Sequence, residues 1–157
     1  MDYATQQAWI SRRAKELEAC FPHLKPRSPS GKSTVGWVAG NVRRFFQHQW
    51  PDIPCSTRSD TSSAGFFVQL DYPQLPGAPA REEVRQILGR FCSQRYDPIQ
   101  ETFVPNEDQE DKAFRKAFGG LSSLSVVPRK PSPEDVARHL KTHLSTGTAT
   151  KRNSPRL

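Results

Sequence analysis

The chain has 157 residues, of which 34% are hydrophobic and 25% charged, and its formal net charge is +7. No stretch approaches the roughly 20 consecutive apolar residues of a membrane-spanning helix, and the first residues lack the basic and apolar segments of a secretory signal. These features exclude a membrane-spanning protein and predict a cytoplasmic one.

The positive charge is concentrated at the two ends of the chain. Residues 1–51 carry eight Lys/Arg and three Asp/Glu, a net charge of +5, and residues 128–157 carry seven and two, again +5. The middle, residues 52–127, carries eight basic and eleven acidic residues, a net charge of −3. Basic ends favour contact with nucleic acid or with an anionic partner surface. The same charge is also compatible with a protein that is merely soluble.

Two amphipathic helices are predicted at the start of the chain. The first covers residues 3–21 and ends before Pro22, because proline disfavours helix at the preceding residue. A Pro/Gly-rich linker follows to residue 32. The second helix begins at a Ser33 or Thr34 cap and extends to about residue 49. Apolar residues at helical spacing line the two helices: Trp9, Ile10, Leu17 and Phe21 in the first, Val38, Val42, Phe45 and Phe46 in the second.

A β-hairpin is predicted next. Residues 53–58 form a short strand candidate, residues 59–65 a polar turn, and residues 66–72 a strand with strict alternation. A helix then begins near Pro79 and carries the regular apolar series Val84, Ile87, Leu88 and Phe91. Tyr96-Asp97-Pro98 breaks this pattern, and residues 99–104 are a third strand candidate.

Helix and strand candidates alternate again in the last third of the chain. Phe114, Phe118 and Leu121 fall at helical spacing, and residues 124–127 are a short strand candidate. A final helix begins at Ser132, where S-x-x-D resembles a capping box. Val136, Leu140 and Leu144 line that helix.

Together these elements predict an α+β fold: a small antiparallel sheet with helices on one face, flanked by an N-terminal and a C-terminal helix. The expected organisation is an N-terminal helix and linker over residues 1–32, an α+β core domain over 33–127, a C-terminal helix over 128–144 and a disordered basic tail over 145–157.

No catalytic, metal or cofactor site is predicted. The three cysteines, at positions 20, 55 and 92, form no C-x-x-C pair and are interpreted as buried or half-buried core residues. His139 and His143 are four residues apart but lack further ligands, so they are interpreted as solvent-facing. Gly31-Lys32-Ser33 resembles the end of a phosphate loop, but neither the upstream glycine nor a preceding strand is present.

Charged residues are therefore the main candidates for a binding site. The basic residues proposed to contact nucleic acid or a partner are Arg12, Arg13, Lys32, Arg43, Arg44, Arg58, Arg129 and Lys130. The acidic run Glu107, Asp108, Glu110 and Asp111 is either a solvated loop or a negative patch that contacts a basic protein.

Residues 40–104 contain a series of short motifs. They read Phe45-Phe46-Gln47-His48-Gln49-Trp50-Pro51, Thr57-Arg58-Ser59, Phe66-Phe67-Val68-Gln69-Leu70, Leu75-Pro76-Gly77-Ala78-Pro79, Glu83-Val84-Arg85-Gln86-Ile87-Leu88, and Arg90-Phe91 to Tyr96-Asp97. In this order they resemble the family numbered twenty-nine among the large polyvalent protein-associated domains of phages and plasmids. The family usually has a Trp in the second strand, where this chain has Asp71-Tyr72.

The resemblance implies a mobile-element protein that helps foreign DNA survive host defences, and it supplies no catalytic residues. The first hypothesis is thus a non-enzymatic inhibitor that occupies a surface of a host effector protein or nucleoprotein complex, of the anti-CRISPR or anti-restriction type. The alternative is a nonspecific DNA- or RNA-binding protein that uses the basic helices and tail. An enzyme with an unfamiliar site is a third possibility.

Overall fold

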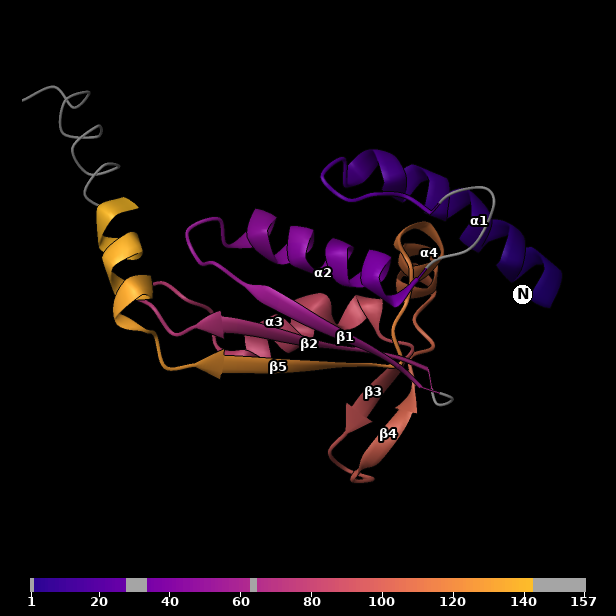
Figure 1. The fold of residues 1–157 in the computed structure, drawn as a ribbon. Coiled ribbons are helices and arrows are strands. Elements are labelled where there is room, and N and C mark those ends of the chain that lie inside the picture. The colour runs from indigo at the N-terminus through magenta and orange to yellow at the C-terminus, as the bar shows by residue number, and fades with distance from the viewer. Residues whose placement is uncertain (1, 28–33, 63–64, 143–157) are drawn as a thin grey trace, which may run out of the picture.

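The computed structural model describes residues 2–27, 34–62 and 65–142, so Lys32 and the expected tail 145–157 lie outside the described residues. The elements in chain order are α1 (Tyr3–Cys20), α2 (Val35–Gln49), β1 (Ser56–Ser62), β2 (Gly65–Pro73), α3 (Arg81–Leu88), the 3₁₀ turn η1 (Gly89–Phe91), β3 (Gln94–Asp97), β4 (Thr102–Pro105), α4 (Gln109–Phe118) and β5 (Ser123–Arg129) (Figure 1). A last helix occupies residues 133–142. None of the described helices is both long and apolar enough to cross a membrane.

The main sheet has three strands in the order β1-β2-β5. The predicted hairpin is confirmed, because β1 and β2 pair antiparallel. β5 runs parallel to β2, which differs from the expected antiparallel sheet. The reason is the long crossover through α3, η1, β3, β4 and α4, which returns the chain to the end of the sheet where β2 begins.

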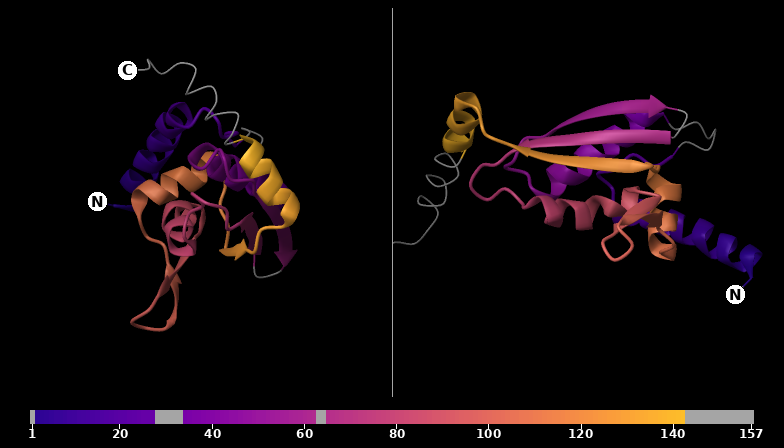
Figure 2. Two further views of the ribbon diagram at one scale, coloured as in Figure 1. Left: turned by 90° about the vertical axis from the view of Figure 1, so that its left-hand side faces the viewer. Right: turned by 90° about the horizontal axis from the view of Figure 1, so that it is seen from below.

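Helices α2 and α3 cover one face of this sheet, and no described helix covers the other face (Figure 2). Val68, Leu70 and Tyr72 of β2 are buried on the covered face, as the alternation of residues 66–72 predicts. Phe46 of α2 packs on Tyr72, with ring centroids 5.1 Å apart. The α+β class, with helices on one face and a helix at each end, is therefore confirmed.

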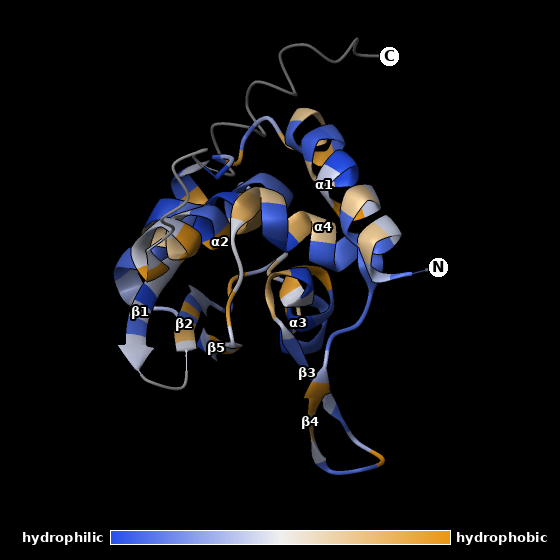
Figure 3. Cartoon of the chain, turned by 90° about the vertical axis from the view of Figure 1, so that its right-hand side faces the viewer, coloured by the Kyte–Doolittle hydropathy of each residue, from blue (hydrophilic) through white to orange (hydrophobic). Residues whose placement is uncertain are grey.

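Helix α1 lies side by side with α4 (Figures 1 and 3). Ile10, Ala14 and Leu17 are the buried residues of α1, and they belong to the same hydrophobic core as the sheet. Spacings of three and four residues place them on one side of the helix. The N-terminal helix consequently fixes the position of α4.

Side-chain caps set the helix starts. The side chains of Asp2, Thr34 and Asp108 accept hydrogen bonds from main-chain N–H groups in the first turns of α1, α2 and α4. The predicted box at the last helix is confirmed: the Asp135 N–H donates to Ser132 Oγ at 3.1 Å, and the Ser132 N–H donates to Asp135 Oδ2 at 2.9 Å.

Two strands lie at other positions along the chain than the sequence predicted. β1 begins at Ser56 and runs through most of the expected polar turn, while the apolar Ile53 lies buried before it. β3 occupies the segment where Tyr96-Asp97-Pro98 was expected to end regular structure. Pro98 instead lies in the turn between β3 and β4, where its missing N–H breaks no ladder hydrogen bond.

The last helix packs with the opposite face from the one expected. Val136 and Leu140 are 40% and 54% exposed, whereas Asp135 and His139 are buried. Asp135 is held there by an ion pair with Arg129 of β5, with Arg129 Nη1 2.7 Å from Asp135 Oδ2. His139 is therefore not solvent-facing, and His143 lies outside the described residues.

Candidate functional site

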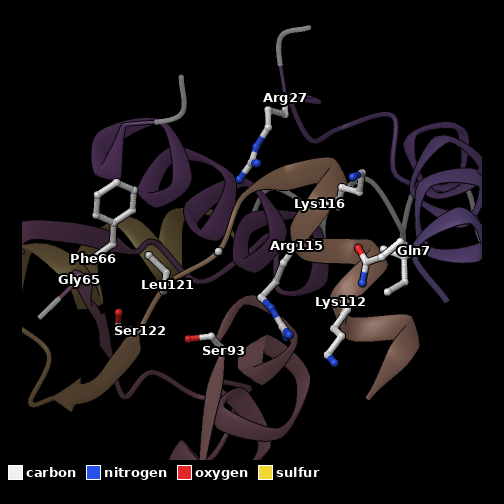
Figure 4. Close-up of a pocket in the computed structure, with 12 residues that line it drawn as sticks. Gln7, Arg27, Gly65, Phe66, Ser93, Lys112, Arg115, Lys116, Leu121 and Ser122 are labelled. Carbon is white, nitrogen blue, oxygen red and sulfur yellow. The ribbon is translucent and has the colours of Figure 1, made fainter. Parts of the chain in front are cut away.

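A shallow hollow of about 550 Å³ opens where α1, α4 and the start of β2 meet (Figure 4). Its lining residues are Gln7, Ile10, Arg27, Gly65, Phe66, Ser93, Lys112, Arg115, Lys116, Gly120, Leu121 and Ser122. Four of these side chains are basic and none is acidic. We call this feature the basic hollow.

Helix α4 supplies three of the four basic residues. Arg115 and Lys116 follow Lys112 by three and four residues, so both lie on the side of the helix that carries Lys112. Arg27 comes from the segment after α1 and approaches α4 from its C-terminal end, where the Arg27 N–H donates to the Ala117 carbonyl at 2.7 Å. Helical spacing therefore brings the three residues of α4 together, and one tertiary contact adds Arg27 to them.

The side chains of two of the four cations, Lys112 and Arg115, have local partners. Lys112 Nζ lies 2.7 Å from Glu107 Oε2, so its charge is partly neutralised. Arg115 is half-buried, and its guanidinium donates to the carbonyls of Cys92 and Asn106. Burial lowers the pKa of Arg115 from its usual value, but arginine stays charged at neutral pH. Arg115 makes no ion pair in the described part of the chain, but the carboxylates of α4 and of the segment before it, Asp111, Asp108 and Glu107, lie near enough to act on its charge.

Arg27 and Lys116 are the two exposed cations of the hollow. Neither forms an ion pair with any residue in the ranges 2–27, 34–62 and 65–142. They therefore keep their full charge and their hydrogen-bond donors for a bound anion.

Asn41 holds the segment that carries Arg27. This fully buried side chain donates to the carbonyls of Lys25 and Phe118 at 2.9 and 3.0 Å, and it accepts from the Lys25 N–H at 2.9 Å. One side chain of α2 thereby connects the linker to the end of α4. A buried amide with its partners satisfied in this way fixes the geometry of the elements that it joins.

Gly65 forms part of the rim at the start of β2. Its φ of 128° lies in a region that side chains disfavour, and a Cβ there would lie 1.9 Å from Ser122 Oγ. Only glycine lets β2 lie so close to the segment that precedes β5. That segment places Leu121 and Ser122 in the lining of the hollow.

The structure brings two of the predicted site residues together. Arg13 of α1 makes an ion pair with Glu110 of α4 at 2.8 Å, and also with Glu16 at 2.9 Å. A residue of the predicted basic set thus neutralises one of the predicted acidic set. The pair joins α1 to α4 and leaves less charge for an outside partner.

The rest of the acidic run also has local partners. Asp108 caps α4 by accepting from the Asp111 N–H at 2.8 Å, and Asp111 accepts from the Asn106 side chain at 3.1 Å. Glu107 pairs with Lys112, which lowers the pKa of this carboxyl group. Acidic groups at a helix N-terminus also stabilise the helix dipole. The acidic run therefore stabilises the first turn of α4.

The other predicted basic residues do not converge. Arg12 and Arg43 are exposed on α1 and α2, and Arg44 donates to Asn41 Oδ1 at 3.3 Å. Arg58 lies on β1 beside a smaller hollow of about 260 Å³ on the uncovered sheet face. Arg129 pairs with Asp135, and Lys130 is exposed next to it in the chain. None of these six residues lines the basic hollow.

Sequence reasoning missed all four cations of the hollow. The spacing of Lys112, Arg115 and Lys116 could have revealed three of them, but the adjacent acidic run gave this part of the chain a net negative charge. Arg27 carried no local signal, because its place depends on the contact with the end of α4.

The cysteines differ in exposure. Cys20 is exposed rather than core, Cys55 is half-buried and Cys92 is buried. Burial raises the pKa of the Cys55 and Cys92 thiols to about 11, so both are protonated at neutral pH. In the described ranges no three or more His, Cys, Asp or Glu side chains gather to hold a metal ion.

Comparison of the chain with models of protein families gives no match, and comparisons with curated proteins and with solved structures give none either. The resemblance of residues 40–104 to a phage and plasmid domain family accordingly stays a prediction.

Proposed function

We propose that the protein is a non-enzymatic nucleic-acid-binding protein whose basic hollow contacts the phosphate backbone. The observation that carries the proposal is the convergence of Arg27, Lys112, Arg115 and Lys116 around one hollow without a lining carboxylate. Lys and Arg contacts to phosphates supply most of the affinity in sequence-independent nucleic-acid binding. The net charge of +7 acts in the same direction.

The shape of the hollow also favours a long polyanion over a small ligand. Small-molecule sites are usually enclosed and mostly apolar, with a few polar groups. The basic hollow is shallow, and four of its twelve lining residues are cationic. A nucleic-acid backbone can pass across such a surface and contact two exposed cations without being enclosed.

Paired charge removals test the proposal. Arg27→Gln/Lys116→Gln removes the two exposed cations of the hollow, and Arg43→Gln/Lys130→Gln removes two exposed cations outside it. Binding of a fluorescently labelled DNA duplex and of one of its single strands is measured by anisotropy at low salt. We expect the first variant to lose at least about tenfold in affinity and the second to lose much less. Equal losses in the two variants, or no binding by the wild type, would contradict the proposal.

Inhibition of a host nucleic-acid-targeting defence complex, of the anti-CRISPR or anti-restriction type, is a second proposed function. The structural feature that favours it is the apolar pair Val136 and Leu140, one turn apart on the exposed side of the last helix. Exposed apolar patches are typical of protein-protein contact sites, and the resemblance of residues 40–104 suggests a counter-defence context. Affinity purification from host lysate should recover an effector subunit. Recovery of none, together with no protection of incoming DNA, would rule the inhibitor out.

A further inference from the structure

The hairpin formed by β3 and β4 projects from the body of the protein (Figures 1 and 2). Tyr96 and Phe103 lie directly opposite each other in its register. Their ring centroids are 5.6 Å apart at an interplanar angle of 68°. The two side chains remain 56% and 59% exposed, so most of their aromatic surface contacts only water.

This aromatic pair has no part in the core. Neither Tyr96 nor Phe103 belongs to the buried cluster or packs against it. Two exposed rings on a projecting hairpin bury little apolar area, so they contribute little to folding. Large exposed aromatic side chains are instead common where a protein binds a partner with flat apolar surfaces.

A residue of the basic hollow holds the base of the hairpin. Arg115 donates to the carbonyl of Cys92 at 3.0 Å and to that of Asn106 at 3.2 Å, and these two residues flank the hairpin. Asn106 connects the two sides as well, because its side chain donates to the Cys92 carbonyl at 3.1 Å. An isolated two-stranded hairpin is marginal in water, so this clamp fixes the hairpin relative to the hollow.

The hollow and the aromatic pair are also close along the chain. Ser93 lines the hollow and immediately precedes β3. Tyr96 follows three residues later, which is roughly 10 Å of extended strand. A nucleic-acid strand that left the hollow along β3 would reach Tyr96 within this distance.

We propose that Tyr96 and Phe103 stack on unpaired bases of a single-stranded nucleic acid whose phosphates occupy the basic hollow. The inference rests on the proposed function and specifies its ligand. Aromatic platforms beside a basic groove are the usual means of binding single strands, because every base has a flat face. In a duplex the faces of the bases are already stacked, so the same rings gain little from them.

The test compares a single strand with the duplex that contains it. Tyr96→Ala/Phe103→Ala should weaken binding of the labelled single strand by about five- to 150-fold, the effect of losing one stacked base, and change duplex binding by less than about threefold. Ile99→Ala is the matched control, because Ile99 is exposed on the same hairpin outside the aromatic pair. It should leave both affinities unchanged.

A second variant separates stacking from apolar contact and from damage to the hairpin. Tyr96→Leu/Phe103→Leu keeps apolar bulk at both positions, and its affinity for the single strand should fall as far as that of the alanine variant. Full retention of affinity in the leucine variant would overturn the stacking role. So would equal losses for single strand and duplex in the alanine variant.

The outcomes also distinguish this inference from the proposed function. If Arg27→Gln/Lys116→Gln weakens both ligands while the aromatic variants weaken neither, the basic hollow binds nucleic acid and the stacking inference is wrong. If the wild type binds neither ligand, the proposed function itself fails. An aromatic variant that loses only a captured protein partner would make the hairpin a protein-docking element and would overturn the inference.

Discussion

Replacement of Asn41 tests how the position of Arg27 is fixed. Asn41→Leu keeps a side chain of similar size. It removes the oxygen that accepts from the Lys25 N–H and the amide group that donates to two carbonyls. Three main-chain groups lose their partner: the N–H and the carbonyl of Lys25, and the carbonyl of Phe118. The bond to the Phe118 carbonyl is buried, whereas the two bonds to Lys25 are only part-buried.

The expected loss of stability follows from how deeply each of these hydrogen bonds is buried. An unpaired buried polar group costs about 1–3 kcal/mol. The Phe118 carbonyl should incur most of that cost, and the two Lys25 groups should incur less because water can reach the linker. We therefore expect the free energy of unfolding to fall by about 2–5 kcal/mol, a large part of the roughly 5–15 kcal/mol of a typical domain.

Urea unfolding followed by circular dichroism measures this change. Gln47→Leu is the matched control, because Gln47 is exposed on the same helix, and surface replacements usually change stability by less than about 0.5 kcal/mol. The Asn41 variant should also bind nucleic acid more weakly at temperatures where it is still folded, since the linker that carries Arg27 is released. A stability loss below about 1 kcal/mol would refute the inference that Asn41 fixes this linker.

Three further predictions concern other contacts. The ion pair with Arg129 holds the pKa of Asp135 well below its usual range. The stabilisation by this ion pair is therefore complete above the unfolded value of about 3.9, and it is lost progressively as pH falls from there through the lowered pKa of the folded state. The melting temperatures of the wild type and Arg129→Gln should accordingly differ most at pH 7 and draw closer as pH falls from about 4 towards about 2, and a constant difference over this range would contradict the assignment. At pH 8 a thiol reagent should modify the exposed Cys20 long before Cys92, whose pKa burial raises to about 11; peptide mass spectrometry identifies the order, and faster labelling of Cys92 would contradict it. Gly119→Ala should lower stability by at least about 1 kcal/mol in urea unfolding, because φ is 92° and a Cβ would lie 2.7 Å from a methyl carbon of α2; an unchanged midpoint would count against this geometry.

Local signals accounted for much of the fold. The alternation of residues 66–72 predicted which side chains of β2 are buried, and the S-x-x-D pattern predicted the cap at Ser132. Both depend on neighbouring residues, so a sequence displays them directly. The parallel pairing of β5 depends on where the long crossover returns the chain, and no local pattern records that.

The candidate site was harder to predict than the fold. Arg13 seemed available for an anionic partner because its residue type is basic, but the packing of α1 on α4 places Glu110 against it. Arg27 seemed to be an ordinary linker residue, and only the contact with the end of α4 brings it to the hollow. Charge can be counted from sequence, whereas its neutralisation or clustering depends on tertiary contacts.

The aromatic hairpin illustrates the same difference. Proline at position 98 indicated a break, which is correct for the turn, but the flanking residues pair across it as β3 and β4. Contacts of Arg115 and Asn106 at the base of the hairpin hold these short strands together, and they come from residues outside the strands. A sequence pattern of only four residues a side is too short to reveal such a hairpin.

The salt dependence of nucleic-acid binding tests the role of the basic hollow most directly. For a duplex, each phosphate contact contributes about −0.9 to the slope of log K against log salt concentration. Removal of the exposed cations by Arg27→Gln/Lys116→Gln should therefore make the slope less negative by about 1.8. The control variant Arg43→Gln/Lys130→Gln should keep a slope near the wild-type value. Equal slopes for the wild type and the hollow variant would show that phosphates do not occupy the hollow.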